Sequence, residues 1–179
     1  MPATTTSWKK LFLFCTGLAL AASFCMKWLE PSFQVQGQSF GIIGLELFYP
    51  KEKVMNILAG LDTHTKALLR YHLYFDFMFM AGIFPAIASL CMLARERLQH
   101  KNVRRFLFIL ATLQTLAWAL DITENSFLLN WIDKPVIDSQ FSLFHLVVSA
   151  KWIIAILGVI TALTVLLLRR KPERLIARV

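Results

Sequence analysis

Residues 117–131, AWALDITENSFLLNW, close an apolar run that begins at Phe106. A run of that length is typical of a membrane-spanning helix. It nevertheless carries Asp121, Glu124 and Asn125, whose spacing of three and four residues places them on one helix face. Because a charge at mid-bilayer costs roughly 2.5–3.5 kcal/mol, such residues normally face a partner or a water-filled cavity. The stretch therefore predicts a polar site inside a membrane protein, but it does not say what that site does.

The composition of the chain also indicates a membrane protein. Of the 179 residues, 57% are hydrophobic and only 17% are charged. The net charge of +8 would suit a nucleic-acid-binding protein, but the basic residues gather at the ends of apolar runs, as the positive-inside rule expects. No polar surface interleaves aromatic and basic residues, so we expect no nucleic-acid partner. The three cysteines lie in apolar segments without a CxxC motif and are interpreted as small core residues.

The apolar runs predict an all-α fold, an integral membrane four-helix bundle that forms a single domain. The spans are expected at about residues 11–28, 67–93, 106–130 and 141–168. The ALAAS sequence at 19–23 could be a signal-peptidase site, but we expect the first span to be retained. The segment 32–66 should contain an irregular or hairpin stretch and then a short amphipathic helix from Lys51 to Ala59. That helix would lie along the membrane surface, cap the bundle or act as a plain connector.

Ionisable residues of three predicted spans lie at a similar depth. With about 1.5 Å per residue, Asp76 lies about 9 Å, Glu124 about 9 Å, Asp121 about 13 Å and His145 about 8 Å from the ends of their spans that face the poorly charged loops. We therefore expect these four side chains to converge on one interior site. Lys151 lies deeper, about 16 Å from that end, and should pair with Asp121 or Asp76.

Two further stretches of the chain are informative, LELFYPKEKVMNILAGLDTHTKALLRYHLYFDFMF at 45–79 and LDITENSFLL at 120–129. They resemble a group of small four-span bacterial membrane proteins that has no assigned activity. In that group a surface segment leads into a span with an inward Asp, and a later span carries D-x-x-E-N. The resemblance covers roughly the second and third spans with their lead-in. It implies the same architecture, a bacterial inner membrane and the importance of Asp76, Asp121, Glu124 and Asn125, and it implies no reaction.

Three hypotheses account for this polar layer. It can fix helix packing through interhelical polar contacts, each worth only about 0.6 kcal/mol. It can hold a divalent metal such as zinc, since imidazole and carboxylate suit that ion. It can bind a lipid or another amphiphilic ligand, with or without acting on it through acid–base groups, since the spacing does not require catalysis. The candidate metal ligands are His72, Asp76, Glu124 and His145, the candidate ligand-binding residues are Asp76, Asn125, Tyr74, Lys151 and Ser149, and the candidate catalytic residues are Asp121, Glu124 and His145.

The leading hypothesis is an integral membrane protein whose polar pocket in the outer leaflet binds a membrane lipid or a similar amphiphile. The alternative is an accessory or assembly subunit, with a membrane-protein partner or a second copy of the chain, in which the polar layer only serves packing. A proton-coupled transporter ranks below both, because four spans in one copy leave little room for alternating access. No GxSxG elbow, phosphate-binding glycine loop or CxxCH motif is present.

The distribution of basic residues predicts that both termini are cytoplasmic. Residues 1–10 hold two of the 19 lysines and arginines, and the stretches 94–105 and 169–179 hold five each. In a background without native cysteines, a Gln36→Cys variant should react with an impermeant maleimide added to intact cells. A Lys101→Cys variant should react only after permeabilisation. Labelling of Gln36→Cys from the cytoplasmic side alone would contradict this topology.

Overall fold

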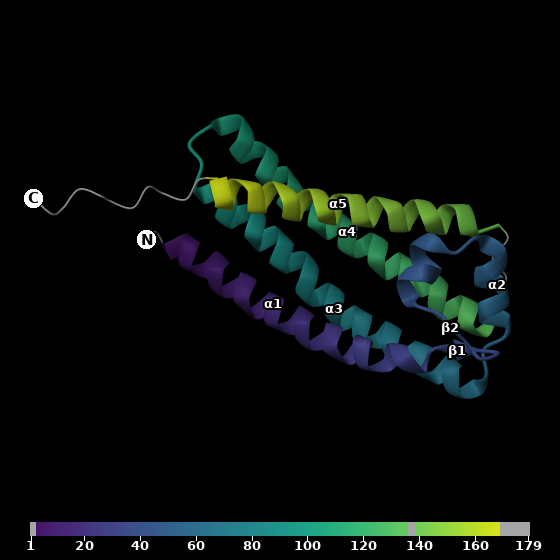
Figure 1. Ribbon diagram of the computed structural model, residues 1–179. Helices are drawn as coiled ribbons and strands as arrows, with labels where there is room; N and C mark the ends of the chain where they lie inside the picture. The colour runs from purple at the N-terminus through teal and green to yellow at the C-terminus, as the bar shows by residue number, and fades with distance from the viewer. Residues whose placement is uncertain (1–2, 136–138, 169–179) are drawn as a thin grey trace, which may run out of the picture.

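Four long helices form a bundle in the computed structural model, which describes residues 3–135 and 139–168 (Figure 1). They are α1 (Ala3–Leu29), α3 (Thr63–Glu96), α4 (Lys101–Asp133) and α5 (Phe141–Leu168). Each is long and apolar enough to cross a membrane. The prediction of an all-α, four-helix integral membrane protein is therefore confirmed. The predicted tail at 169–179 lies outside the described residues.

The helices extend beyond the apolar spans because polar residues continue them at both ends. At the start of α3, the Asp62 carboxylate accepts a hydrogen bond of 2.6 Å from the backbone N–H of Thr65. This contact satisfies one of the free N–H groups of the first turn. At the same end of the bundle, Arg70 of α3 forms an ion pair with Asp133 at the end of α4.

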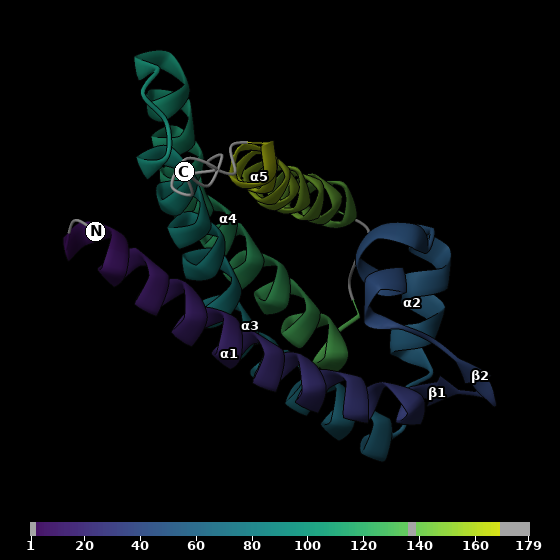
Figure 2. The same cartoon turned by 60° about the vertical axis from the view of Figure 1, so that its left-hand side comes forward.

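Helix α3 occupies the centre of the bundle. It packs against α1, α4 and α5, and α4 packs in addition against α5. In contrast, α1 packs along α3 and has no extensive contact with α5. Figure 2 shows α1 and α5 on different sides of the α3–α4 pair. Helices α1 and α5 are therefore separated from each other, which allows a groove to form between them.

The connection between α1 and α3 contains every short element of the described chain. After η1 (Glu30–Ser32), strands β1 (Gln34–Val35) and β2 (Gln38–Ser39) pair antiparallel. Gln36 and Gly37 form the turn between them with φ of 51° and 77°, positive values that tight two-residue hairpins require. A π-helical turn, η2 (Gly44–Phe48), and α2 (Lys51–Ala59) follow. The expected hairpin and the expected short helix are both present.

This connection covers one end of the bundle and is packed onto it. Val54, Ile57 and Leu58 of α2 are buried, and their spacing places them on one helix face. They belong to a cluster that also contains residues from α3, α4 and α5. Of the three roles that the sequence left open for this helix, α2 therefore has the one of capping the bundle. The cluster includes Phe33, Leu45, Leu69, Leu73, Leu128, Trp131, Ile132, Phe144 and Val148.

Small residues set the close approach of α1 and α3. Cys15, Ala19 and Ala22 of α1 are buried, and Gly82 of α3 lies directly beneath them. A Cβ atom at Gly82 would lie 2.6 Å from Ala19 N and 2.7 Å from Cys15 O. Both are backbone atoms of a helix and cannot move independently. Small residues at a crossing are the usual means by which helices approach closely in membranes.

We predict that Gly82→Ala lowers the thermal unfolding temperature in detergent. Overpacking of a close interface costs about 1–3 kcal/mol, which exceeds the 0.5–1 kcal/mol or so that alanine contributes over glycine within a helix. The matched control is Gly17→Ala on α1, where a Cβ would meet nothing within 4 Å. This variant should unfold at or above the wild-type temperature. Equal unfolding temperatures for the two variants would show that Gly82 does not set the crossing.

Candidate functional site

A buried lysine lies at the centre of the candidate site. Lys151 of α5 is 6% exposed. Its Nζ donates a 2.8 Å hydrogen bond to Asp121 Oδ1 and lies 2.5 Å from Glu124 Oε2, and both of these carboxyl groups come from α4. Glu46 of η2 is a third neighbour, with its Oε2 at 3.9 Å from Nζ. We refer to Lys151, Glu46, Asp121 and Glu124 as the Lys151 cluster.

The same face of α4 also binds α3. Asn125 is fully buried, and its Nδ2 donates a 2.6 Å hydrogen bond to Asp76 Oδ2. In the D-x-x-E-N sequence, Asp121 and Glu124 therefore face α5, and Asn125 faces α3. One turn of α4 thus joins three helices through polar contacts. The predicted pairing of Lys151 with a carboxylate agrees with this geometry, with Asp121 and not Asp76 as its partner.

Glu46 was not among the candidate residues from the sequence. It lies in LELFYP, between apolar neighbours, and is 8% exposed. Burial raises the pKa of its carboxyl group, against the opposing effect of the Lys151 charge. The signal that identifies Asp121, an acid within an apolar stretch, is present at Glu46 as well. It is easily missed because η2 lies outside the four spans.

A cavity of about 410 Å³ adjoins the Lys151 cluster. Residues of α1 and α5 form its two sides, and α3 lies between them. Its polar end contains Glu46, Asp76, Asp121 and Lys151, and Lys27 of α1 and Glu30 of η1 lie at its rim as a 2.7 Å ion pair. The remaining lining is mostly apolar, and Ile156 and Ile160 of α5 are exposed. The cavity thus opens along an apolar side. The apolar lining includes Met26, Phe79, Ile83, Phe84, Ile87, Trp152, Ala155 and Val159.

Three of the four residues expected to converge do so, and His145 does not. Its ring packs against Phe141 and Phe144, with ring centroids 4.6 and 6.1 Å apart. The reason is helical phase, because the separation of six positions between His145 and Lys151 corresponds to a rotation of about 240°. Once Lys151 faces the cluster, His145 is turned away from it. Equal depth is therefore not sufficient to bring side chains together.

Tyr74 and Ser149 are also placed away from the cluster. Each lies two residues from a cluster-facing residue, Asp76 and Lys151 respectively, a rotation of about 200°. Tyr74 is 53% exposed and packs on Tyr71, with ring centroids 6.5 Å apart. Ser149 is likewise exposed. Neither side chain lines the cavity.

The proposed metal ligands do not assemble. Within residues 3–135 and 139–168, no group of three or more His, Cys, Asp or Glu side chains could hold a metal ion. His72 is buried beneath Phe33, with ring centroids 5.4 Å apart, and His145 is packed between phenylalanines. The ammonium group of Lys151 already occupies the space between the α4 carboxylates. The expected ligands His72, Asp76, Glu124 and His145 are therefore not gathered around one point among the described residues.

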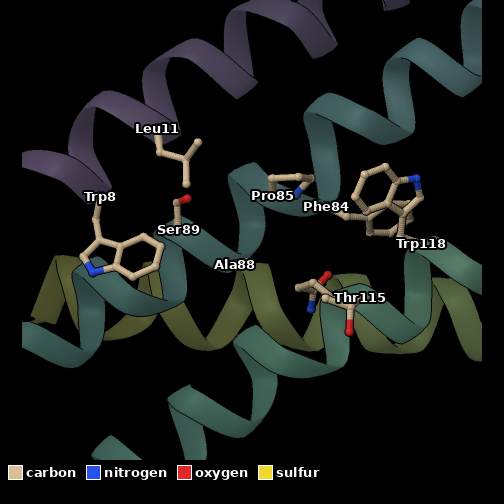
Figure 3. A pocket seen from close by; sticks show the side chains of 9 residues that line it. Trp8, Leu11, Phe84, Pro85, Ala88, Ser89, Thr115 and Trp118 are labelled. Carbon is tan, nitrogen blue, oxygen red and sulfur yellow. The ribbon is translucent and has the colours of Figure 1, made fainter.

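A second, smaller cavity lies between α1, α3 and α4 (Figure 3). Its volume is about 170 Å³, and Trp8, Phe84 and Trp118 contribute aromatic walls. The lining contains no ionisable side chain. Thr115, one of its polar residues, donates to the carbonyl of Thr112 in its own helix. This cavity is a weaker candidate than the one beside Lys151, since few polar groups in it could orient a ligand.

No protein-family model matches the chain, and no curated protein or solved structure shows significant similarity to it. The resemblance to small four-span bacterial membrane proteins therefore stays a prediction.

We predict that Lys151→Met destabilises the protein in detergent by about 3–5 kcal/mol, because removal of one partner from a buried ion pair leaves uncompensated charge. Thermal unfolding provides the measurement. Lys27→Met is the control, because its side chain is 67% exposed and forms its ion pair with Glu30, and exposed ion pairs contribute about 0–1 kcal/mol. Wild-type melting of Lys151→Met would show that the cluster does not stabilise the bundle.

Proposed function

We propose that this membrane protein binds a lipid or a similar amphiphile in the cavity between α1, α3 and α5. The observation that carries the proposal is the division of the cavity into a charged end and an apolar remainder. The head group would lie at Glu46, Asp76, Asp121 and Lys151, and the acyl chain would follow the apolar lining toward Ile156 and Ile160.

The size and shape of the cavity support this proposal. Ligand pockets usually span roughly 300–1,000 Å³ and combine an apolar lining with a few polar groups that fix orientation. The volume of about 410 Å³ falls in that range. Since α1 and α5 are not packed together, an acyl chain could enter from the bilayer between them.

The proposal concerns binding and includes no reaction. Asp121 and Glu124 are both engaged by Lys151, and His145 lies elsewhere on α5. The acid–base arrangement expected from the sequence is therefore not assembled among the described residues. Within this proposal the charged end is the non-cytoplasmic end and the membrane is a bacterial inner membrane, as the basic residues and the resemblance predict.

Native mass spectrometry of protein purified in mild detergent tests the proposal. The wild type should retain bound lipid. Ala155→Phe would fill the apolar part of the cavity and should weaken retention about tenfold, equivalent to about 1.4 kcal/mol. The matched control is Ile153→Phe, on the exposed face of α5 and outside the cavity lining, and it should retain lipid like the wild type.

Two results would contradict lipid binding in this cavity. One is equal retention by wild type and Ala155→Phe. The other is a wild-type spectrum without lipid alongside a stoichiometric protein partner, which would favour the accessory-subunit hypothesis.

A further inference from the structure

The cavity is lined by more carboxyl groups than lysines can neutralise. Glu30 at the rim is paired with Lys27 at 2.7 Å. The three other carboxyl groups of the lining, from Glu46, Asp76 and Asp121, share Lys151 as the only remaining lysine of the lining. Glu124, behind the lining, lies 2.5 Å from the same ammonium group. Buried charge of one sign is unfavourable unless it is protonated or meets a counter-charge.

Part of this excess is relieved within the cluster. Lys151 is engaged most closely by Asp121 and Glu124, at 2.8 and 2.5 Å. Glu46 is farther from the lysine, at 3.9 Å, and burial raises the pKa of its carboxyl group, which favours its protonated form. Asp76 is left without a close cation among the described residues.

Asp76 is also the carboxylate best placed to meet a ligand. It lines the cavity and is partly exposed. Within the described part of the chain, its one hydrogen-bond donor is the neutral amide of Asn125, at 2.6 Å. Because Asn125 Nδ2 donates to Asp76, its Oδ1 must be an acceptor, and this buried atom has no partner among the described residues. Oε1 of Glu124 likewise makes no hydrogen bond there.

At the polar end, buried acceptors without a partner therefore outnumber such donors, of which the lining contains the indole N–H of Trp152, and negative charge is in excess. A phosphate group alone provides hydrogen-bond acceptors and negative charge. It therefore complements neither the acceptors nor the negative charge of the polar end. A glycerol head group provides hydroxyl donors without positive charge. A quaternary amine provides charge without N–H donors. A primary ammonium group provides three donors, one positive charge and no acceptor, and charge-assisted hydrogen bonds to carboxylates are the stronger kind.

We infer that the amphiphile bound in this cavity carries a primary ammonium in its head group, with Asp76 as its principal carboxylate partner. Phosphatidylethanolamine has this chemistry. The inference rests on the proposed function, since it specifies the head group of the same ligand.

The experiment compares three phospholipids with identical dioleoyl chains, added in mixed micelles to the wild-type protein in detergent. Their head groups are phosphoethanolamine, phosphocholine and phosphoglycerol, and the measurement is apparent affinity from the shift in unfolding temperature. We expect phosphatidylethanolamine to bind at least about tenfold more tightly than the other two, the equivalent of about 1.4 kcal/mol. Asp76→Asn should abolish this preference. The matched control is Glu52→Gln, at an exposed position of α2 outside the cavity, and it should keep the preference.

The possible outcomes separate the two proposals. Equal stabilisation by all three lipids, lost in Ala155→Phe, would overturn the ammonium inference and leave lipid binding intact. No stabilisation by any lipid would overturn lipid binding itself. An ethanolamine preference that survives Asp76→Asn would remove Asp76 as the partner and overturn the inference as stated. The lipid comparison uses the wild-type protein alone, so it is decisive even if Asp76→Asn fails to fold.

Discussion

The ion cluster around Lys151 is the constraint on which the rest of the structure depends. A lysine buried in an apolar bundle requires carboxylates within a few ångströms, and three different elements are bound by that requirement. Asp121 and Glu124 of α4 lie within 2.8 Å of its Nζ, and Glu46 of η2 approaches from the connection between α1 and α3. The rotation of α5, the face of α4 turned toward it and the position of η2 are thus linked at one atom.

The parts of the site that follow from helical geometry could be predicted from the sequence. Asp121, Glu124 and Asn125 share a face because of their spacing, and that face is buried between α3 and α5. Depth was predictable for the same reason, since helix rise is constant. The rotation of one helix relative to another could not be predicted, because it depends on which residue faces the cluster. Lys151 takes that position, and His145 and Ser149 are therefore turned away.

The groove between α1 and α5 lies beyond what single-sequence patterns can predict. It depends on a close α1–α3 crossing at Gly82, where a Cβ would meet the backbone of α1. Nothing in the hydropathy of α1 indicates which of its small residues faces another helix. Glu46 was missed for a related reason, since its burial arises from tertiary packing of η2 onto the bundle and not from membership of a span. Local patterns predict elements, whereas contacts between elements create the cavity.

The proposed ligand would account for the position of the Lys151 cluster, which stability alone does not require. A buried ion pair is often no more stabilising than well-packed apolar residues of similar volume, because desolvation offsets the Coulombic attraction. An apolar layer at Lys151, Asp121 and Glu124 would pack the helices without three carboxyl groups gathered around one ammonium group. If the cluster served stability alone, its charges would not have to lie at the end of a cavity. They do lie there, with Asp76 partly exposed to the cavity and with Asn125 Oδ1 lacking a hydrogen-bond partner in the part of the chain that the structure describes. A cluster that only joined helices could be sealed within the seam between α4 and α5, and the opening of this one toward α1 supports a role in binding.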